Sequence, residues 1–144
     1  MKILLPTDGS EGALEAVHHA LRLVHAGLRA HFVLANVQEP ASLYEVVVAH
    51  DAAVIEQVTA AAAAHSLESA QALLRAAGAQ FETEVAAGDP GHALVEIAQR
   101  FECELVIMGA RGVGALRGGL FGSVSNAVLH AAQVPVTIVR QTEA

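Results

Sequence analysis

Short apolar segments alternate along the chain with segments of helical periodicity. Most of the apolar segments carry no polar alternation, which is typical of strands buried on both faces. One segment instead alternates polar and apolar positions from residue 80 to residue 86, which predicts a half-exposed strand at a sheet edge. The strands predicted in this way are residues 2–6, 32–37, 80–86, 105–108 and 136–139.

Helical signals occupy the intervals between these strands. Ser10 is placed to cap a first helix that Gly27 ends. Asp89 and Pro90 give an N-cap followed by proline at the first helical position. Residues 42–77 fit either one long helix or a loop that feeds a helix. The alternation of strands and helices predicts the α/β class, with a parallel sheet covered by helices on both faces.

Composition excludes several classes of protein. The 144 residues have the length of one domain, 1–144, and 53% hydrophobic against 16% charged residues exclude disorder. Fifteen acidic against eight basic residues give a net charge of -7, which disfavours nucleic-acid partners. No apolar run approaches the roughly 18 residues of a membrane span, and the single Cys103 excludes an internal disulfide. We expect a soluble, cytoplasmic protein without a nucleic-acid or membrane partner.

The most informative segment is the glycine-rich motif Gly109-x-x-Gly112-x9-Gly122-Ser123, between a predicted strand and a last predicted helix. At such a junction the free N–H groups and dipole of the helix favour an anion, and glycine lets the backbone approach phosphate closely. Arg111 and Arg117 place two of the eight basic residues in this segment. A flexible solvent loop with two solubilising arginines is the alternative, but the strand before and the helix after favour phosphate binding.

Two common nucleotide motifs are absent from the sequence. Lys2 is the only lysine, so the chain has no Walker-type loop. Residues 112–117 carry arginine where a dinucleotide fingerprint needs its third glycine. NAD and FAD are therefore not expected as cofactors.

Asp8 lies at the carboxyl end of the first predicted strand. A carboxylate there can accept hydrogen bonds from a ribose or hold a hydrated Mg²⁺ on phosphates, although it equally suits the turn into the first helix. If the first and fourth strands are neighbours, Asp8 and Gly109 face each other at a topological switch point. Sequence spacing alone does not fix that strand order.

The whole chain resembles the universal stress protein family, in particular its ATP-binding branch. The resemblance rests on residues 3–10, Gly88-Asp89-Pro90, the glycine-rich motif and the closing segment 134–139. It implies a three-layer α/β/α fold of the adenine nucleotide alpha hydrolase-like type, with a five-stranded parallel sheet in the order 3-2-1-4-5. It also implies ATP, with Mg²⁺, at the switch point, and homodimers joined through the last strand.

The same resemblance assigns positions around the nucleotide. Asp8 would meet the ribose or the metal-phosphate region, and Val37 would contact adenine through its backbone. Residues 108–109 would flank the ribose, and residues from Arg111 onward would surround the phosphates. Asn36 departs from the histidine that members often carry. The binding residues implied are Pro6, Thr7, Asp8, Val37, Met108, Gly109, Arg111, Gly112, Gly122, Ser123, Val124 and Ser125.

The last predicted strand is apolar on both faces, and the proline before it suits a strand at a sheet edge. An isolated monomer would expose this edge, and only a few residues follow that could cover it. We therefore expect it to pair with the same strand of a second chain in a homodimer. The residues of this strand are Val136, Thr137, Ile138 and Val139.

Other reactive residue types give weaker signals. The eight histidines share no ligand spacing, which leaves any metal site unknown. Ser123 and His130 are separated by seven residues of one helix, roughly 10 Å, which is beyond the reach of a catalytic hydrogen bond. Cys103 has no basic partner nearby in sequence and is interpreted as a core residue.

These observations favour a regulatory module that changes state with the level of adenine nucleotide. A slow ATP hydrolase or phosphotransferase using the same pocket is one alternative, and a nucleotide-free stress dimer acting through protein partners is another. Fast phosphoryl transfer needs a positioned base and a cation with Mg²⁺, and only Asp8 is available for the base or metal role. Binding is therefore favoured over catalysis, and no catalytic residue is assigned. The preference among ATP, ADP and cyclic AMP stays open.

Overall fold

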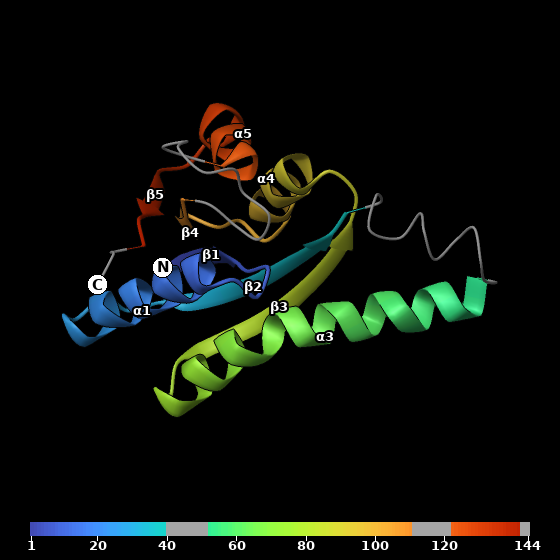
Figure 1. The fold of residues 1–144 in the computed structure, drawn as a ribbon. Helices are drawn as coiled ribbons and strands as arrows, with labels where there is room; N and C mark the ends of the chain where they lie inside the picture. Colours follow the sequence, from blue (N-terminus) through green and yellow to red (C-terminus); the bar gives the residue numbers. More distant parts are fainter. Residues whose placement is uncertain (40–51, 111–121, 142–144) are drawn as a thin grey trace.

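The computed structural model describes residues 1–39, 52–110 and 122–141. Strands and helices alternate along these ranges (Figure 1). The strands are β1 (Lys2–Pro6), β2 (His31–Gln38), β3 (Gln80–Ala87), β4 (Leu105–Gly109) and β5 (Val136–Val139). The helices are α1 (Glu11–His25), α3 (Ala52–Ala76), α4 (Pro90–Arg100) and α5 (Ser123–Ala131).

The five strands form one sheet in the order β3-β2-β1-β4-β5, and every neighbouring pair is parallel. This confirms the α/β class and the 3-2-1-4-5 order that the resemblance implied. The chain leaves β1 towards β2 on one side and returns to β4 on the other, so a topological switch point lies between β1 and β4.

Two apolar clusters hold the helices on the sheet, one on each face. Ile3, Phe32 and other residues pack beneath α1 and α3, whereas Leu4, Val33 and other residues pack beneath α4 and α5. Successive residues of a strand point to opposite faces, so strands covered on both faces need apolar residues at every position. Cys103 lies in the second cluster and is 5% exposed, which confirms its interpretation as a core residue.

Helix ends follow the predicted capping signals. The Ser10 hydroxyl accepts a hydrogen bond from the Ala13 N–H at 3.2 Å, and Gly27 follows α1 with a φ of +113° that suits glycine. Of the ambiguous segment 42–77, residues 52–76 form α3. The remainder up to residue 51 lies outside the described residues.

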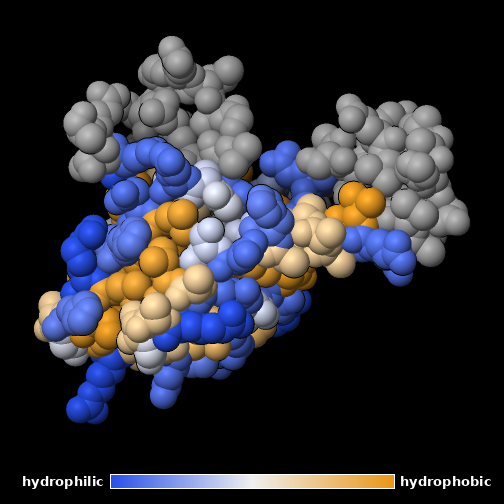
Figure 2. Space-filling model, turned by 60° about the horizontal axis from the view of Figure 1, so that its bottom comes forward, coloured by the Kyte–Doolittle hydropathy of each residue, from blue (hydrophilic) through white to orange (hydrophobic). Residues whose placement is uncertain are grey.

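The two sheet edges differ in character. β3 is an edge strand, as its alternation predicted, and its Glu84 carboxylate pairs with Arg100 at 2.8 Å. Its apolar face is only partly covered: Phe81 packs against the core, but Val85 is 44% exposed. Figure 2 shows one face of the molecule, on which hydrophobic groups lie interspersed with hydrophilic ones. None of the helices in the described ranges combines the length and the apolar content that crossing a bilayer requires.

Candidate functional site

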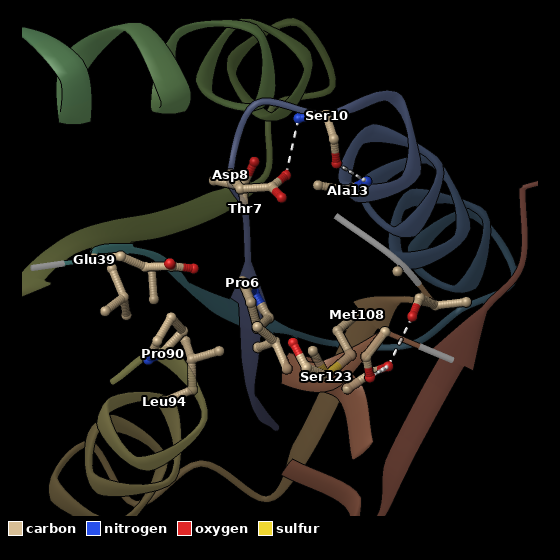
Figure 3. Close-up of a pocket in the computed structure, with 17 residues that line it drawn as sticks. Pro6, Thr7, Asp8, Ser10, Ala13, Glu39, Pro90, Leu94, Met108 and Ser123 are labelled. Atoms are coloured by element: carbon tan, nitrogen blue, oxygen red, sulfur yellow. Dashed lines mark hydrogen bonds between the residues drawn. The ribbon is translucent and has the colours of Figure 1, made fainter. Parts of the chain in front are cut away.

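A cleft lies where β1 and β4 end, at the topological switch point (Figure 3). Its volume of about 180 Å³ is more than ten times what a single water molecule needs, so the cleft has room for a small-molecule ligand. Asp8 and Gly109 both line it, so the ends of β1 and β4, which are far apart in the sequence, lie beside the same cleft. The lining residues are Pro6, Thr7, Asp8, Ser10, Ala13, Ala35, Val37, Glu39, Pro90, Leu94, Met108, Gly109, Ala110, Gly122, Ser123, Val124 and Ser125.

The turn after β1 is held by hydrogen bonds of its own residues. The Asp8 carboxylate accepts from the Ser10 N–H at 2.9 Å, and the Thr7 hydroxyl accepts from the Gly9 N–H at 3.2 Å. Gly9 has a φ of +83°, a conformation that glycine adopts without strain. The turn role of Asp8 is thus confirmed, and its carboxylate also lines the cleft, where the predicted contact with a ribose or Mg²⁺ stays a prediction.

Close packing explains why residue 109, the last residue of β4, is glycine. A Cβ atom at this position would lie 2.7 Å from the Gly12 carbonyl oxygen and 3.2 Å from the Ala13 nitrogen. Side chains do not approach backbone so closely, and these neighbours belong to the first turn of α1. The absence of a side chain thus lets the first turn of α1 and the end of β4 form adjoining walls of the cleft.

Three hydrogen bonds join the residues that border segment 111–121. The Ala110 carbonyl accepts from the Gly122 N–H at 2.7 Å and from the Ser125 hydroxyl at 2.7 Å. The Ser125 oxygen also lies 3.0 Å from the Gly122 carbonyl, and Ser125 is only 2% exposed. The end of β4 and the start of α5 are thereby fixed relative to each other beside the cleft.

Three helices present their amino ends to the cleft, and their capping differs. The Ser10 side chain caps α1, and the Asp89 side chain caps α4 by accepting from the His92 N–H at 3.0 Å. The N-cap of α5 is Gly122, which has no side chain, and no side-chain cap bond is made there within the described residues. The first N–H groups of a helix need acceptors and carry partial positive charge, so this end of the cleft is suited to an anion.

The charges around the cleft are unbalanced. Its described lining contains the carboxylates of Asp8 and Glu39 and neither lysine nor arginine. Figure 3 shows Glu39 and Ser123 on opposite sides of the open space. The described part of the chain contains no group of three or more histidine, cysteine, aspartate or glutamate side chains that could hold a metal ion. A highly charged anion would therefore need positive charge from groups other than the described residues that line the cleft.

The structure brings together most of the residues that the sequence singled out. Ten of the twelve line the cleft, and Arg111 and Gly112, like Arg117, lie outside the described residues. The sequence did not point to the contributions of α4 and of the residue after β2. The Asp89-Pro90 cap was a signal for the former, because it marks a helix start at the same edge of the sheet. The lining residues that were missed are Ser10, Ala13, Ala35, Glu39, Pro90, Leu94 and Ala110.

Comparison with known proteins decides the family. The model of the universal stress protein family matches residues 1–140. The chain belongs to the universal stress protein family. Among curated members, it is 27% identical to universal stress protein MJ0531 of Methanocaldococcus jannaschii, over 97% of this chain and 82% of that protein. It is 32% identical to universal stress protein MT1672 of Mycobacterium tuberculosis, over 97% of this chain and 96% of that protein.

Solved structures share the fold of this universal stress protein. The structure of hypothetical protein MJ0577 superimposes with a TM-score of 0.82 at 23% identity, covering 99% of this chain and 97% of that one. A universal stress protein in complex with cAMP gives a TM-score of 0.67 at 26% identity, covering 99% and 98%. The Arabidopsis thaliana protein At3g01520 with AMP bound gives 0.70 at 16% identity, covering 99% and 92%.

Proposed function

We propose that this universal stress protein binds an adenine nucleotide in the cleft, in particular ATP with Mg²⁺, and acts as a nucleotide-dependent regulatory module in the stress response. The observation that carries the proposal is the amino end of α5, which faces the cleft with glycine in place of a capping side chain. The related universal stress protein solved with cAMP, at 26% identity, supports an adenine nucleotide as the ligand class.

The lining suggests an orientation for the nucleotide. The phosphates would accept hydrogen bonds from the backbone N–H groups of Ser123 and Val124, at the start of α5, where the helix dipole favours negative charge. The ribose would lie near Asp8, between the ends of β1 and β4. The base would then lie towards β2 and α4, where Val37 and Leu94 provide apolar contact.

Charge explains why Mg²⁺ belongs to the proposal. A triphosphate beside the carboxylates of Asp8 and Glu39 is repelled unless cations offset its charge. Oxygen ligands are those that Mg²⁺ prefers, and Asp8 would hold the hydrated ion on the phosphates. When bound, the ion would neutralise part of the phosphate charge, and Arg111, which the glycine-rich motif carries, would supply more.

The lining also supports binding over rapid catalysis. Asp8 and Glu39 are the titratable side chains among the described lining residues, and the Asp8 carboxylate already accepts the Ser10 N–H. Fast phosphoryl transfer needs a base held against its nucleophile together with cationic groups on the transferred phosphate. We therefore propose a module that reports nucleotide level through occupancy of the cleft.

A substitution that caps α5 internally tests this proposal. Gly122→Asp would place a carboxylate at the N-cap, where aspartate is favoured and the backbone is already extended (φ -77°, ψ 170°). We expect stability to be kept or slightly raised while calorimetry shows at least a tenfold loss of MgATP affinity. Gly122→Asn, a neutral cap, should lose less. Absence of MgATP binding by the unmodified protein, or unchanged affinity of Gly122→Asp, would contradict the proposal.

We also propose that two copies pair through β5. All four of its residues are half-exposed at the sheet edge. The Pro135 carbonyl accepts the Val106 N–H and the Val139 carbonyl accepts the Ala110 N–H, so by strand alternation the N–H and C=O groups of Val136 and Ile138 point to the open edge. Within the described residues no other strand pairs with these groups, and together with the apolar side chains they support antiparallel pairing about a two-fold axis.

A further inference from the structure

Two hydrogen-bonded side-chain amides, one of them buried, lie behind the cleft, on the face of the sheet that α1 and α3 cover. The Asn36 side-chain amide donates to the Thr7 carbonyl at 3.0 Å, and the Gln38 amide donates to the Asn36 Oδ1 at 2.6 Å. Asn36 is 1% exposed and is not among the residues that line the cleft. Its contact with the ligand site therefore runs through Thr7, which does line the cleft.

The position of this chain in the sheet explains what it does. The Thr7 N–H still donates to the Ala35 carbonyl of β2 at 2.8 Å, and the main chain then turns away through Asp8 and Gly9 into α1. Where the main chain turns away from β2, the Asn36 side chain donates a hydrogen bond to the Thr7 carbonyl. The amide thus anchors the first peptide of the turn that carries the Asp8 carboxylate.

The direction of the hydrogen bonds is fixed along the chain. An amide facing the Thr7 carbonyl must present its NH₂ group, because its oxygen would face another oxygen. The Asn36 oxygen then points to Gln38, whose backbone is itself held because its carbonyl accepts from the Gly88 N–H at 3.1 Å. The bond from Asn36 to Thr7 is buried, so water does not replace it, whereas the bond from Gln38 to Asn36 is part-buried. Loss of the Gln38 donor should therefore change the orientation of the Asn36 amide and with it the bond to Thr7.

We propose that Asn36 and Gln38 are positioning residues for the nucleotide cleft, and that they hold the Thr7–Asp8 turn in its ligand-binding geometry. The inference rests on the proposed nucleotide function and extends it to two side chains that touch no ligand. It also accounts for asparagine at this position, since its amide supplies the N–H donor that the Thr7 carbonyl needs.

Two substitutions of Gln38 separate the role of the donor from the role of charge. Gln38→Met removes the donor at similar length and without charge, so MgATP affinity should fall roughly five- to tenfold at every pH. Gln38→Glu should show the same loss at pH 7.5, where the ionised carboxylate cannot donate. As the pH falls towards 4.5 a growing fraction of the carboxyl is protonated and regains its donor, so the affinity should approach that of the unmodified protein measured in parallel.

Gln99→Glu is the matched control, because Gln99 is exposed near the carboxyl end of α4 while the amino end of that helix lines the cleft. It adds the same charge and should follow the unmodified protein at each pH. Unchanged affinity of Gln38→Met, or a Gln38→Glu affinity with no pH dependence beyond that of this control, would overturn the inference.

A measurement without nucleotide keeps the inference separate from the proposed function. The backbone amide resonances of Gly9 and Ser10 should shift in Gln38→Met, and their change between pH 4.5 and 7.5 should be larger in Gln38→Glu than in Gln99→Glu, in which the Asp8 carboxylate also bonds to Ser10. If these shifts appear and the unmodified protein binds no MgATP, the positioning role stands and the nucleotide function fails. If the resonances do not respond, the positioning role fails whatever the ligand.

Discussion

Gly109 of β4 lies directly against Gly12 of α1, so closely that a Cβ on Gly109 would be 2.7 Å from the Gly12 carbonyl oxygen. This contact joins the fourth strand to the first turn of the first helix and brings together residues almost a hundred positions apart. The cleft exists in its observed form because residue 109 has no side chain.

Gly109→Ala should therefore disturb stability and ligand binding together. The added methyl group meets backbone, which has little room to yield, and overpacking of this kind costs about 1–3 kcal/mol. Denaturant unfolding and MgATP calorimetry would measure the two effects. Gly91→Ala is the comparison, since its Cβ would lie 2.5 Å from the Ala127 side chain and neither residue lines the cleft. It should lose stability, and the folded protein should lose less affinity than Gly109→Ala.

Ser125→Ala should loosen the junction between β4 and α5. It removes the hydroxyl that bonds the Ala110 carbonyl, at a cost of about 1 kcal/mol in unfolding free energy, and should also lower nucleotide affinity. Ser123→Ala changes an exposed serine at the start of the same helix and should leave stability nearly unchanged. Equal stability of the two variants in urea titrations would contradict a structural role for Ser125.

Binding of ATP should depend on Mg²⁺ because the described lining is acidic. Removal of Mg²⁺ with EDTA should weaken ATP binding to the unmodified protein. Asp8→Asn keeps an oxygen that can accept the Ser10 N–H but removes a negative charge beside the phosphates. We expect this variant to bind MgATP several-fold more weakly and to lose less affinity when Mg²⁺ is removed. A Mg²⁺ dependence identical to that of the unmodified protein in calorimetry would exclude Asp8 from holding the ion.

Dimer formation through β5 should require the outward N–H of Ile138. Ile138→Pro removes that donor, and the peptide group involved points away from β4, so light scattering should show a monomer. Ile138→Ala loses the same side-chain packing but keeps the N–H, and it should remain dimeric. A dimeric proline variant would place the interface elsewhere.

Stability should fall at alkaline pH partly through Cys103. Burial raises the pKa of its thiol, so in the folded state the thiolate forms at a higher pH than in the unfolded chain. As the pH rises above the pKa of the unfolded thiol, the unfolded state releases its proton first and the folded state loses relative stability. Unfolding free energies at pH 7 and pH 9.5 should differ more for the unmodified protein than for Cys103→Ala. Equal differences would exclude this contribution.

The strands and caps were predictable because their signals are local. Lys2–Pro6 and Val136–Val139 match the predicted strands residue for residue, and Ser10 caps α1 as its position indicated. Local signals were weaker where burial depends on distant elements. Val85 continues an apolar alternation, yet it is 44% exposed, because a residue of an edge strand is buried only where another element packs on it.

The sequence by itself determined the class of the fold, its strands and its helix caps, because strand burial and helix capping depend on neighbours along the chain. The resemblance to the universal stress protein family implied ten of the residues that line the cleft. Only the tertiary structure decided that Asp8 and Gly109 line one cleft, and that Pro90, Leu94 and Glu39 complete it. It also decided that Asn36 lies behind the cleft, bonded to Thr7. Such relationships depend on which strands pair and on which helix ends lie at the same edge of the sheet. The spacing of residues along one strand or one helix does not determine strand pairing or the position of helix ends.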